Sequence, residues 1–172
     1  MKRCALVLAL SLLGTEASAM DLSSPAFSNG GVLSLAQVKC GGQNISPALQ
    51  WSGEPSSTKS FALTVFDPDA HGGWWHWIVL NIPANVHQLV SGAGSGAGLP
   101  PGAVPGSNDF SQPTYGGPCP PPGSGVHHYE FTLWALPSVN SPLSADTKPD
   151  SVAQYLASHA LAKAELVGTY QR

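Results

Sequence analysis

Three short apolar runs stand out along the middle and the C-terminal half of the chain. They are residues 61–66 (FALTVF), 75–82 (WHWIVLNI) and 129–136 (YEFTLWAL). Each is rich in aromatic and β-branched residues and is bounded by Gly, Pro or Asp, which is the pattern of strands. Because the first two are almost continuously apolar, we expect those strands to be buried on both faces. Shorter patterns predict further strands over 32–38, 48–51 and 165–170.

The other patterns predict a peripheral helix and a long loop. Asp150 is placed to N-cap a helix that runs to about Ala162. Its apolar stripe recurs at helical spacing and consists of Val152, Tyr155, Leu156 and His159. We expect this whole stripe, His159 included, to face the core. Residues 90–125 are rich in Gly and Pro, and a structureless loop of this length inside a domain is usually functional. The sequence therefore predicts a mostly β domain with one or two helices at its edge.

The start of the chain has the pattern of a targeting segment. Two basic residues are followed by the apolar stretch 4–13, and residues 17–19 (ASA) form an A-x-A cleavage site. This is a secretory signal peptide, and its apolar stretch is much shorter than the ~20 residues that span a bilayer. We therefore expect a signal peptide over 1–19, a single domain over 20–172, no membrane span, and export to a periplasm or out of the cell.

Composition and charge limit the classes of partner. The 172 residues are 42% hydrophobic and 10% charged, which supports a packed core and excludes wholesale disorder. The formal net charge is −3, and Lys and Arg form no cluster in the sequence. A nucleic-acid backbone requires clustered cations, so we expect no nucleic-acid partner.

Two cysteines, Cys40 and Cys119, remain after removal of the signal peptide. An exported chain meets oxidising conditions, so a Cys40–Cys119 disulfide is one hypothesis. A pair of free, buried thiols is the other. The spacing alone does not show that the two Cα atoms lie close enough to be bridged.

Four segments carry most of the polar chemistry. They are 67–71 (DPDAH), 74–77 (WWHW), 115–123 (YGGPCPPPG) and 127–129 (HHY). Several of these polar side chains fall where a loop meets a predicted strand, which is a common way to build a pocket on a rigid base. Some of these side chains can also have a purely structural role instead of a role in a pocket. Asp67 and Asp69 can cap backbone N–H groups in a turn, and His76, placed by strand alternation opposite Trp75 and Trp77, can be a satisfied core residue.

The same segments contain residue types that occur in catalytic and metal-binding sites. His127 and Tyr129 are two apart and therefore share one face of their strand, whereas His128 points to the other. Asp67, His76 and His127 have the composition of a two-His-one-carboxylate metal site, although three separated segments would have to supply the ligands. Ser46, Ser52 and Ser107 have no G-x-S-x-G setting, and Cys119 lies among prolines with no Lys or helix N-terminus beside it. Hence no nucleophile is predicted.

Taken in order, these motifs resemble the phosphatidylethanolamine-binding protein family, and in particular its bacterial Raf kinase inhibitor-like branch. The resemblance covers nearly the whole chain after the signal peptide, from 24–27 (SPAF) to 165–170 (ELVGTY). Its motifs are 40–47 (CGGQNISP), 67–70 (DPDA), 74–84 (WWHWIVLNIPA), 108–110 (NDF), 116–121 (GGPCPP) and H-x-Y at 127–129. The combination is specific, whereas any single motif is weak evidence.

The resemblance implies a fold and a site. The fold is mostly β (α+β), with a large, antiparallel-rich central sheet packed on a smaller sheet and peripheral helices. The site is a small pocket that binds anions, including phosphate and the phosphoethanolamine headgroup. The residues carried over as ligand-binding are Asp67, His76, Pro120, Pro121, His127 and Tyr129. The supporting residues are Asp69, which orders the turn, Trp75, Gly117 and Cys119. We expect no catalytic residue, no metal ligand and no cofactor.

Three positions depart from the family pattern. His71 replaces the usual Pro after DPDA, His128 stands where many relatives have Arg, and Ser111 stands where many have Gly. The first two changes place histidines near the expected pocket mouth and remove a permanent cation.

These observations lead to an exported, non-enzymatic binding or regulatory protein with a small anionic ligand. In the expected arrangement, the rings of His76 and His127, the Tyr129 hydroxyl and the backbone N–H groups of 116–119 donate to the anion. Asp67 accepts from a histidine. Binding is then strongest while the histidines are charged and weakens above about pH 6.5–7.5. The alternatives are a metal-dependent phosphoesterase that uses the same Asp/His cluster and an inhibitor of a kinase or a serine protease.

Overall fold

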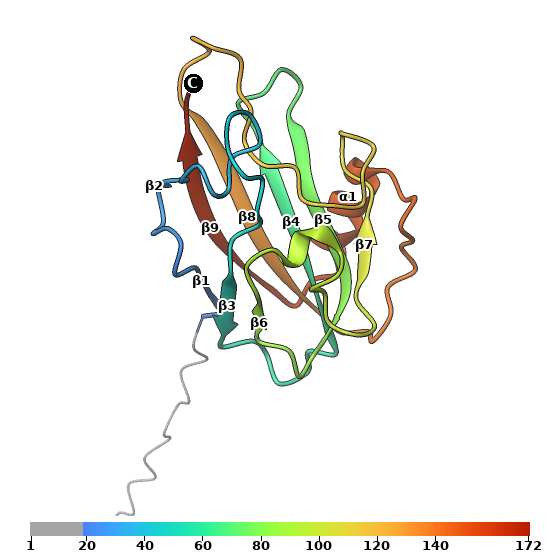
Figure 1. The fold of residues 1–172 in the computed structure, drawn as a ribbon. Coiled ribbons are helices and arrows are strands. Elements are labelled where there is room, and N and C mark those ends of the chain that lie inside the picture. The colour runs from blue at the N-terminus through green and yellow to red at the C-terminus, as the bar shows by residue number, and fades with distance from the viewer. Residues whose placement is uncertain (1–18) are drawn as a thin grey trace, which may run out of the picture.

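Strands dominate the computed structural model, which describes residues 19–172 (Figure 1). The predicted signal peptide covers residues 1–19, and residues 1–18 of it lie outside the described part of the chain. No helix within residues 19–172 is both long enough and apolar enough to cross a membrane.

Six strands form the large sheet in the order β2-β9-β8-β4-β5-β7. They are β2 (Gly31–Val32), β9 (Ala162–Tyr170), β8 (His127–Leu136), β4 (Ser60–Asp67), β5 (Trp74–Pro83) and β7 (Val104–Gly106). All neighbours pair antiparallel except β2 and β9, which are parallel. The three long apolar runs of the sequence are thus the central strands β4, β5 and β8.

A second, three-stranded sheet covers one face of the large sheet. It consists of β1 (Asp21–Ser23), β3 (Leu49–Ser52) and β6 (Gln88–Leu89) in the antiparallel order β1-β3-β6. Figure 1 shows these strands lying across the lower part of the long strands. The expectation of a mostly β fold, with a large sheet packed on a smaller one, is confirmed.

Alternation along the central strands builds two cores. On β4, Phe61 and Leu63 belong to the main core, together with Trp51 of the small sheet. Ala62, between them in sequence, belongs to a second core with Leu156 of α1 (Pro149–His159). The large sheet is therefore buried on both faces, as the continuous apolar runs predict, because side chains of a strand alternate between its two sides.

The chemistry-bearing segments meet at one end of this sheet. β4 ends at Asp67, β5 begins at Trp74 opposite it, and β8 begins at His127. In Figure 1 this is the upper end of the long strands.

Two predicted elements differ from the structure. Residues 32–38 supply only the end of the two-residue strand β2, because a turn follows in which the Ser34 hydroxyl binds the backbone of Ala36 and the side chain of Gln37. The loop over 90–125 is also not structureless, since it contains the short 3-10 helix η1 (Ala93–Ser95) and the edge strand β7.

The position of the predicted helix is confirmed, but the predictions of Asp150 as its N-cap and of a core-facing His159 are wrong. Lys148 is the N-cap residue and makes no side-chain cap bond. The Asp150 carboxylate instead accepts a hydrogen bond from the Trp75 indole N–H at 2.9 Å. His159 is exposed because the helix ends there, and its ring stacks on Tyr155 with the centroids 4.1 Å apart.

Candidate functional site

A cavity of about 540 Å³ opens at the end of the sheet where β4 stops and β5 and β8 start. All six residues predicted to bind the ligand line it: Asp67, His76, Pro120, Pro121, His127 and Tyr129. Asp69, Cys119 and His71 also line it, together with Lys39, Ala70, Trp74, Phe110 and Ser124. The cavity is thus large enough for a small organic ligand, and its wall combines titratable groups with apolar rings.

Asp67 anchors one side of the pocket, and its carboxylate is fully used by the protein. Its Oδ1 accepts the backbone N–H groups of Asp69 and Ala70 at 2.9 and 3.2 Å. Its Oδ2 lies 2.7 Å from Nδ1 of His127, and both side chains are buried. The carboxylate therefore both orders the turn after β4 and fixes the orientation of the His127 ring. The turn-ordering role that the resemblance gives to Asp69 belongs to Asp67.

The contacts of His127 specify its protons. Because an ionised carboxylate only accepts, Nδ1 carries the hydrogen that points at Asp67. Nε2 lies 3.0 Å from the Ser124 hydroxyl, which in turn donates to the Pro121 carbonyl at 2.8 Å. All of these bonds form together only when Nε2 also carries a hydrogen. Both ring nitrogens of His127 therefore have protein partners, and neither is free for a ligand.

His76 reaches the pocket because of a β-bulge. The pairing of β4 with β5 shifts register between Val65, opposite Trp77, and Phe66, opposite Trp75, so that His76 is the extra residue. His76 and Trp77 consequently lie on the same side of the sheet, where His76 contacts Tyr129 edge to face at a centroid distance of 5.1 Å. The expectation that His76 lies opposite both tryptophans is wrong for Trp77.

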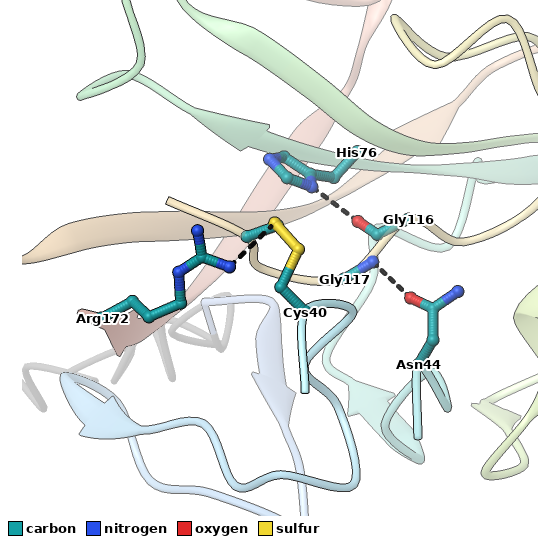
Figure 2. The surroundings of a disulfide bond; sticks show 7 residues. Cys40, Asn44, His76, Gly116, Gly117 and Arg172 are labelled. Atoms are coloured by element: carbon teal, nitrogen blue, oxygen red, sulfur yellow. Dashed lines mark hydrogen bonds between the residues drawn. A yellow bond between two sulfur atoms is a disulfide. The ribbon is translucent and has the colours of Figure 1, made fainter. Parts of the chain in front are cut away.

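The ring of His76 is tied to the loop before Cys119. Its Nδ1 lies 2.5 Å from the Gly116 carbonyl, and the Gly116 N–H donates back to the His76 carbonyl at 2.9 Å (Figure 2). Burial lowers the pKa of His76, and the nearby Lys39 ammonium acts in the same direction, whereas the bond to Gly116 and the Asp67 carboxylate oppose them. His76 is therefore neutral near pH 7.

Two backbone N–H groups of this loop, those of Gly116 and Gly117, are used within the protein. The Gly116 N–H binds His76, and the Gly117 N–H donates to Oδ1 of Asn44 at 2.7 Å (Figure 2). Gly117 also does not line the cavity. The expectation that these two N–H groups bind an anion is wrong, because the loop uses them to attach itself to its neighbours. Gly117 supports the pocket only indirectly, through Asn44.

Two other donors are left without a partner. The Tyr129 hydroxyl and the Trp74 indole N–H are buried and make no hydrogen bond among residues 19–172. Both residues line the cavity. Burial, with the Asp67 and Asp69 carboxylates, raises the pKa of Tyr129, so its hydroxyl keeps its proton.

A cation that the sequence analysis did not single out completes the lining. The Lys39 ammonium lies 3.7 Å from the centroid of the Phe110 ring, in cation–π contact. Two links hold Lys39 beside the pocket: its backbone N–H donates to the Pro118 carbonyl at 3.0 Å, and Cys40, the next residue, is disulfide-bonded to Cys119, with the Cα atoms 5.0 Å apart (Figure 2). Its position next to Cys40 is the signal in the sequence that points to it, once the disulfide is taken as formed.

Trp75 does not belong to the pocket. Its ring packs on Phe66 at a centroid distance of 4.3 Å, and its indole N–H binds Asp150 of α1. It lies on the helix side of the sheet, away from the cavity, because Trp74 and Trp75 are consecutive residues of β5 and their side chains point to opposite sides. The assignment of Trp75 as a supporting residue is wrong, and Trp74 is the tryptophan that lines the site.

The two unusual histidines have different surroundings. His71 lines the cavity, whereas His128 is half-exposed and lies outside its lining. The backbone N–H and the Nδ1 atom of His128 both lie 2.8 Å from Oδ2 of Asp69. These hydrogen bonds lower the pKa of the Asp69 carboxyl.

The described residues contain no group of three or more His, Cys, Asp or Glu side chains that could hold a metal ion. Of the trio with the composition of a metal site, Asp67 and His127 bind each other, and His76 binds the Gly116 carbonyl through Nδ1.

Comparisons with known proteins agree on one family. The model of the family described as "Phosphatidylethanolamine-binding protein" matches residues 23–171. The curated "UPF0098 protein YbcL" of Escherichia coli K12 is 43% identical, over 96% of this chain and 94% of that protein. The "Putative lipoprotein LppC" of Mycobacterium tuberculosis H37Rv is 38% identical, over 90% of this chain and 74% of that protein.

Two solved structures share the fold. The crystal structure of E. coli YbcL, described as a new member of the mammalian PEBP family, has a TM-score of 0.86 and 42% identity, and the match covers 90% of this chain and 99% of that chain. A putative PEBP homologue from Chlamydia trachomatis, CT736, has a TM-score of 0.77 and 38% identity over 90% and 98%.

Proposed function

Because the chain belongs to the phosphatidylethanolamine-binding protein family, we propose that its cavity binds a small phosphate-bearing anion, either free phosphate or a phosphoethanolamine headgroup. In this proposal the protein is an exported binding or regulatory protein without catalytic activity.

The unpartnered hydroxyl of Tyr129 is the observation that carries the proposal. An unmade hydrogen bond at a buried donor costs about 1–3 kcal/mol, and Tyr129 is only 1% exposed. A ligand oxygen in the cavity would satisfy this group, and the Trp74 N–H offers a second donor of the same kind. Donors without protein acceptors suit a ligand that has many acceptors, and phosphate is such a ligand.

The charges around the cavity favour an anion. Lys39 contributes a permanent positive charge to the cavity wall. Of the two carboxylates, Asp67 is saturated by three donors, and Asp69 is paired with His128 at the edge. Each carboxylate is thus paired with a histidine, whereas the Lys39 ammonium lies on the Phe110 ring and has no carboxylate partner among residues 19–172.

Binding, rather than catalysis, fits the state of the Asp67–His127 pair. A general base must have a free lone pair within reach of the substrate, and here the carboxylate and the imidazole bind each other and Ser124. We expect no hydrolysis of a phosphate monoester above the buffer rate, with or without added Mg²⁺ or Zn²⁺. Metal-dependent turnover that disappears in His127→Asn would instead favour the phosphoesterase alternative.

The binding experiment is a calorimetric titration of EDTA-treated protein with O-phosphoethanolamine at about pH 6. We expect saturable one-to-one binding. A hydrogen bond to a charged acceptor contributes about 1.5–3 kcal/mol, so Tyr129→Phe should weaken binding by roughly 10–100-fold. Its unfolding free energy should not fall, because the hydroxyl has no hydrogen-bond partner among residues 19–172 to lose.

Matched variants separate the pocket from general effects. Tyr155→Phe alters a tyrosine on α1 and should leave the affinity unchanged. Lys39→Gln should weaken binding, whereas Lys163→Gln, which removes a lysine beside Trp134 on the far strand β9, should not. An absence of heat and of saturation in the wild-type protein would overturn the proposal.

Export is supported by the disulfide, since such bonds persist in oxidising compartments. Its test is the N-terminal sequence of the protein from its native host. We expect it to begin at Met20, and a chain that retains residues 1–19 would contradict export by cleavage at this site.

A further inference from the structure

The hydrogen-bonding atoms of the His76 ring restrict which ligands fit the cavity, in addition to the restriction imposed by charge. Because a carbonyl only accepts hydrogen bonds, the contact between Nδ1 and the Gly116 oxygen places the ring hydrogen of neutral His76 on Nδ1. Nε2 then carries a lone pair. It makes no hydrogen bond to any residue within 19–172, and His76 lines the cavity.

The surroundings of His76 keep this form. The ring is buried, only 4% exposed, and Phe110 and Tyr129 pack edge-on against it at centroid distances of 5.5 and 5.1 Å. The ionisable groups that face it are Lys39, Asp67, His127 and Tyr129 on the pocket side and Asp109 behind it. Burial dominates over the two carboxylates and lowers the pKa of His76.

The cavity therefore offers a neutral acceptor at His76 among several donors. Tyr129, Trp74 and Lys39 can each donate to an unprotonated ligand oxygen. The Nε2 lone pair of His76 repels such an oxygen and attracts a hydroxyl hydrogen. An oxyanion complementary to all four groups has at least two bare oxygens and one O–H.

From this we infer that the pocket selects oxyanions that carry a hydrogen, such as the monoanion of a phosphate monoester, over sulfate-type anions, and that Nε2 of His76 is the acceptor that distinguishes them. This inference rests on the proposed function and adds the protonation state of the ligand. Phosphate monoesters have a second pKa near 6, so the selected species is abundant at mildly acidic pH. A sulfate monoester is a strong acid and has no hydrogen to donate.

O-Phosphoethanolamine and ethanolamine O-sulfate form a matched pair of probes. At about pH 5 both carry one negative charge on the oxyanion and one ammonium group, and they differ by the P–OH. We expect calorimetry at this pH to give at least about tenfold tighter binding of the phosphate ester, which is the effect of one buried acceptor left unpaired. Equal affinities for the two esters would overturn the inference and leave the proposed function intact. No binding of either ester would overturn both.

Proton counting adds an independent readout. At about pH 7.5 the free phosphate ester is mostly a dianion, so it must take up about one proton on binding. Titrations in buffers of different ionisation enthalpy measure this number. The sulfate ester has no proton to gain, and any uptake with it reports the titration of protein groups alone. Uptake of one proton with both esters would mean that His76 becomes an imidazolium donor, and this result would contradict the inference.

A pair of variants assigns the effect to Nε2. In His76→Asn the shorter amide keeps a donor at the position of Nδ1 for Gly116 and removes the group at Nε2. We expect the ratio of the two affinities to fall to about one. His128→Asn changes the exposed histidine outside the cavity and should keep the wild-type ratio. A wild-type ratio in His76→Asn would overturn the assignment. If that variant does not fold, the wild-type ratio and proton count still decide the question.

Discussion

Removal of the Cys40–Cys119 disulfide should reduce stability strongly and ligand binding hardly at all. The bond joins residues 79 positions apart. In the chain-entropy account, closing a loop of this length restricts the unfolded chain by roughly 4.5 kcal/mol at 25 °C. We therefore expect Cys40→Ala/Cys119→Ala to lower the free energy of unfolding by about 2–4.5 kcal/mol. For a chain of this size the loss corresponds to a fall in Tm of roughly 5–15 °C.

The folded pocket should survive because other contacts hold the same two loops together. The Lys39 N–H donates to the Pro118 carbonyl at 3.0 Å, and the Gly117 N–H donates to Asn44 at 2.7 Å. The Tyr115 hydroxyl adds a bond to the Gln37 carbonyl at 3.1 Å. Lys39 thus stays at the cavity wall, and the affinity for O-phosphoethanolamine should change by less than about threefold.

Guanidinium unfolding followed by tryptophan fluorescence measures the stability, and calorimetry measures the affinity. The wild-type protein reduced with dithiothreitol is the control, and it should match the double variant. A loss of stability below about 1 kcal/mol would refute the entropic reasoning. A loss of affinity above about tenfold in a folded variant would show that the disulfide, rather than the hydrogen bonds, positions Lys39.

Three further predictions concern single residues. In Gly117→Ala the added methyl group would overlap the Gln37 carbonyl, so urea unfolding should show a loss of about 1–3 kcal/mol; wild-type stability would contradict this packing. Burial lowers the pKa of His76 below its ordinary value of 6.5, so the unfolded chain binds this proton at a higher pH than the folded protein does. The contribution of His76 to the free energy of unfolding is therefore complete above pH 6.5 and is lost as the pH falls below it. His76→Asn should remove this part of the measured pH dependence, and an unchanged slope would refute it. By NMR the Asp69 carboxyl should titrate below its ordinary pKa of 3.8, and its pKa should rise in His128→Ala; no rise would mean that His128 is not the cause.

Local patterns were sufficient to predict the central strands and to bring the right segments together. β4, β5 and β8 follow directly from apolar runs bounded by turn residues. Asp67 is the last residue of β4, His127 is the first residue of β8, and Tyr129 follows two residues later on the same face. Pairing of β4 with β8 therefore places all three around one cavity. The motif order was specific enough to identify the family, and with it the two-sheet fold.

The bulge shows where such local reasoning ends. The sequence of β5 is consistent with regular alternation, which would put His76 opposite Trp77. Pairing with β4 leaves His76 as an extra residue and turns it, with Trp77, to the pocket side. A register shift depends on how two distant strands match, so the pattern of one strand alone cannot predict it.

The sequence by itself determined which chemical groups the chain carries to this end of the sheet, because strand propensity and alternation are local properties. Only the tertiary structure decided how those groups are used. The hydrogens of His76, His127 and Gly117 are taken by partners from other segments, which leaves the Tyr129 hydroxyl free. Lys39 reaches the cavity because its loop is joined to residues 117–119 by backbone hydrogen bonds and by a disulfide that spans 79 positions. Hydrogen-bond partners and long-range bridges depend on distances between remote parts of the chain, and only the folded arrangement sets those distances.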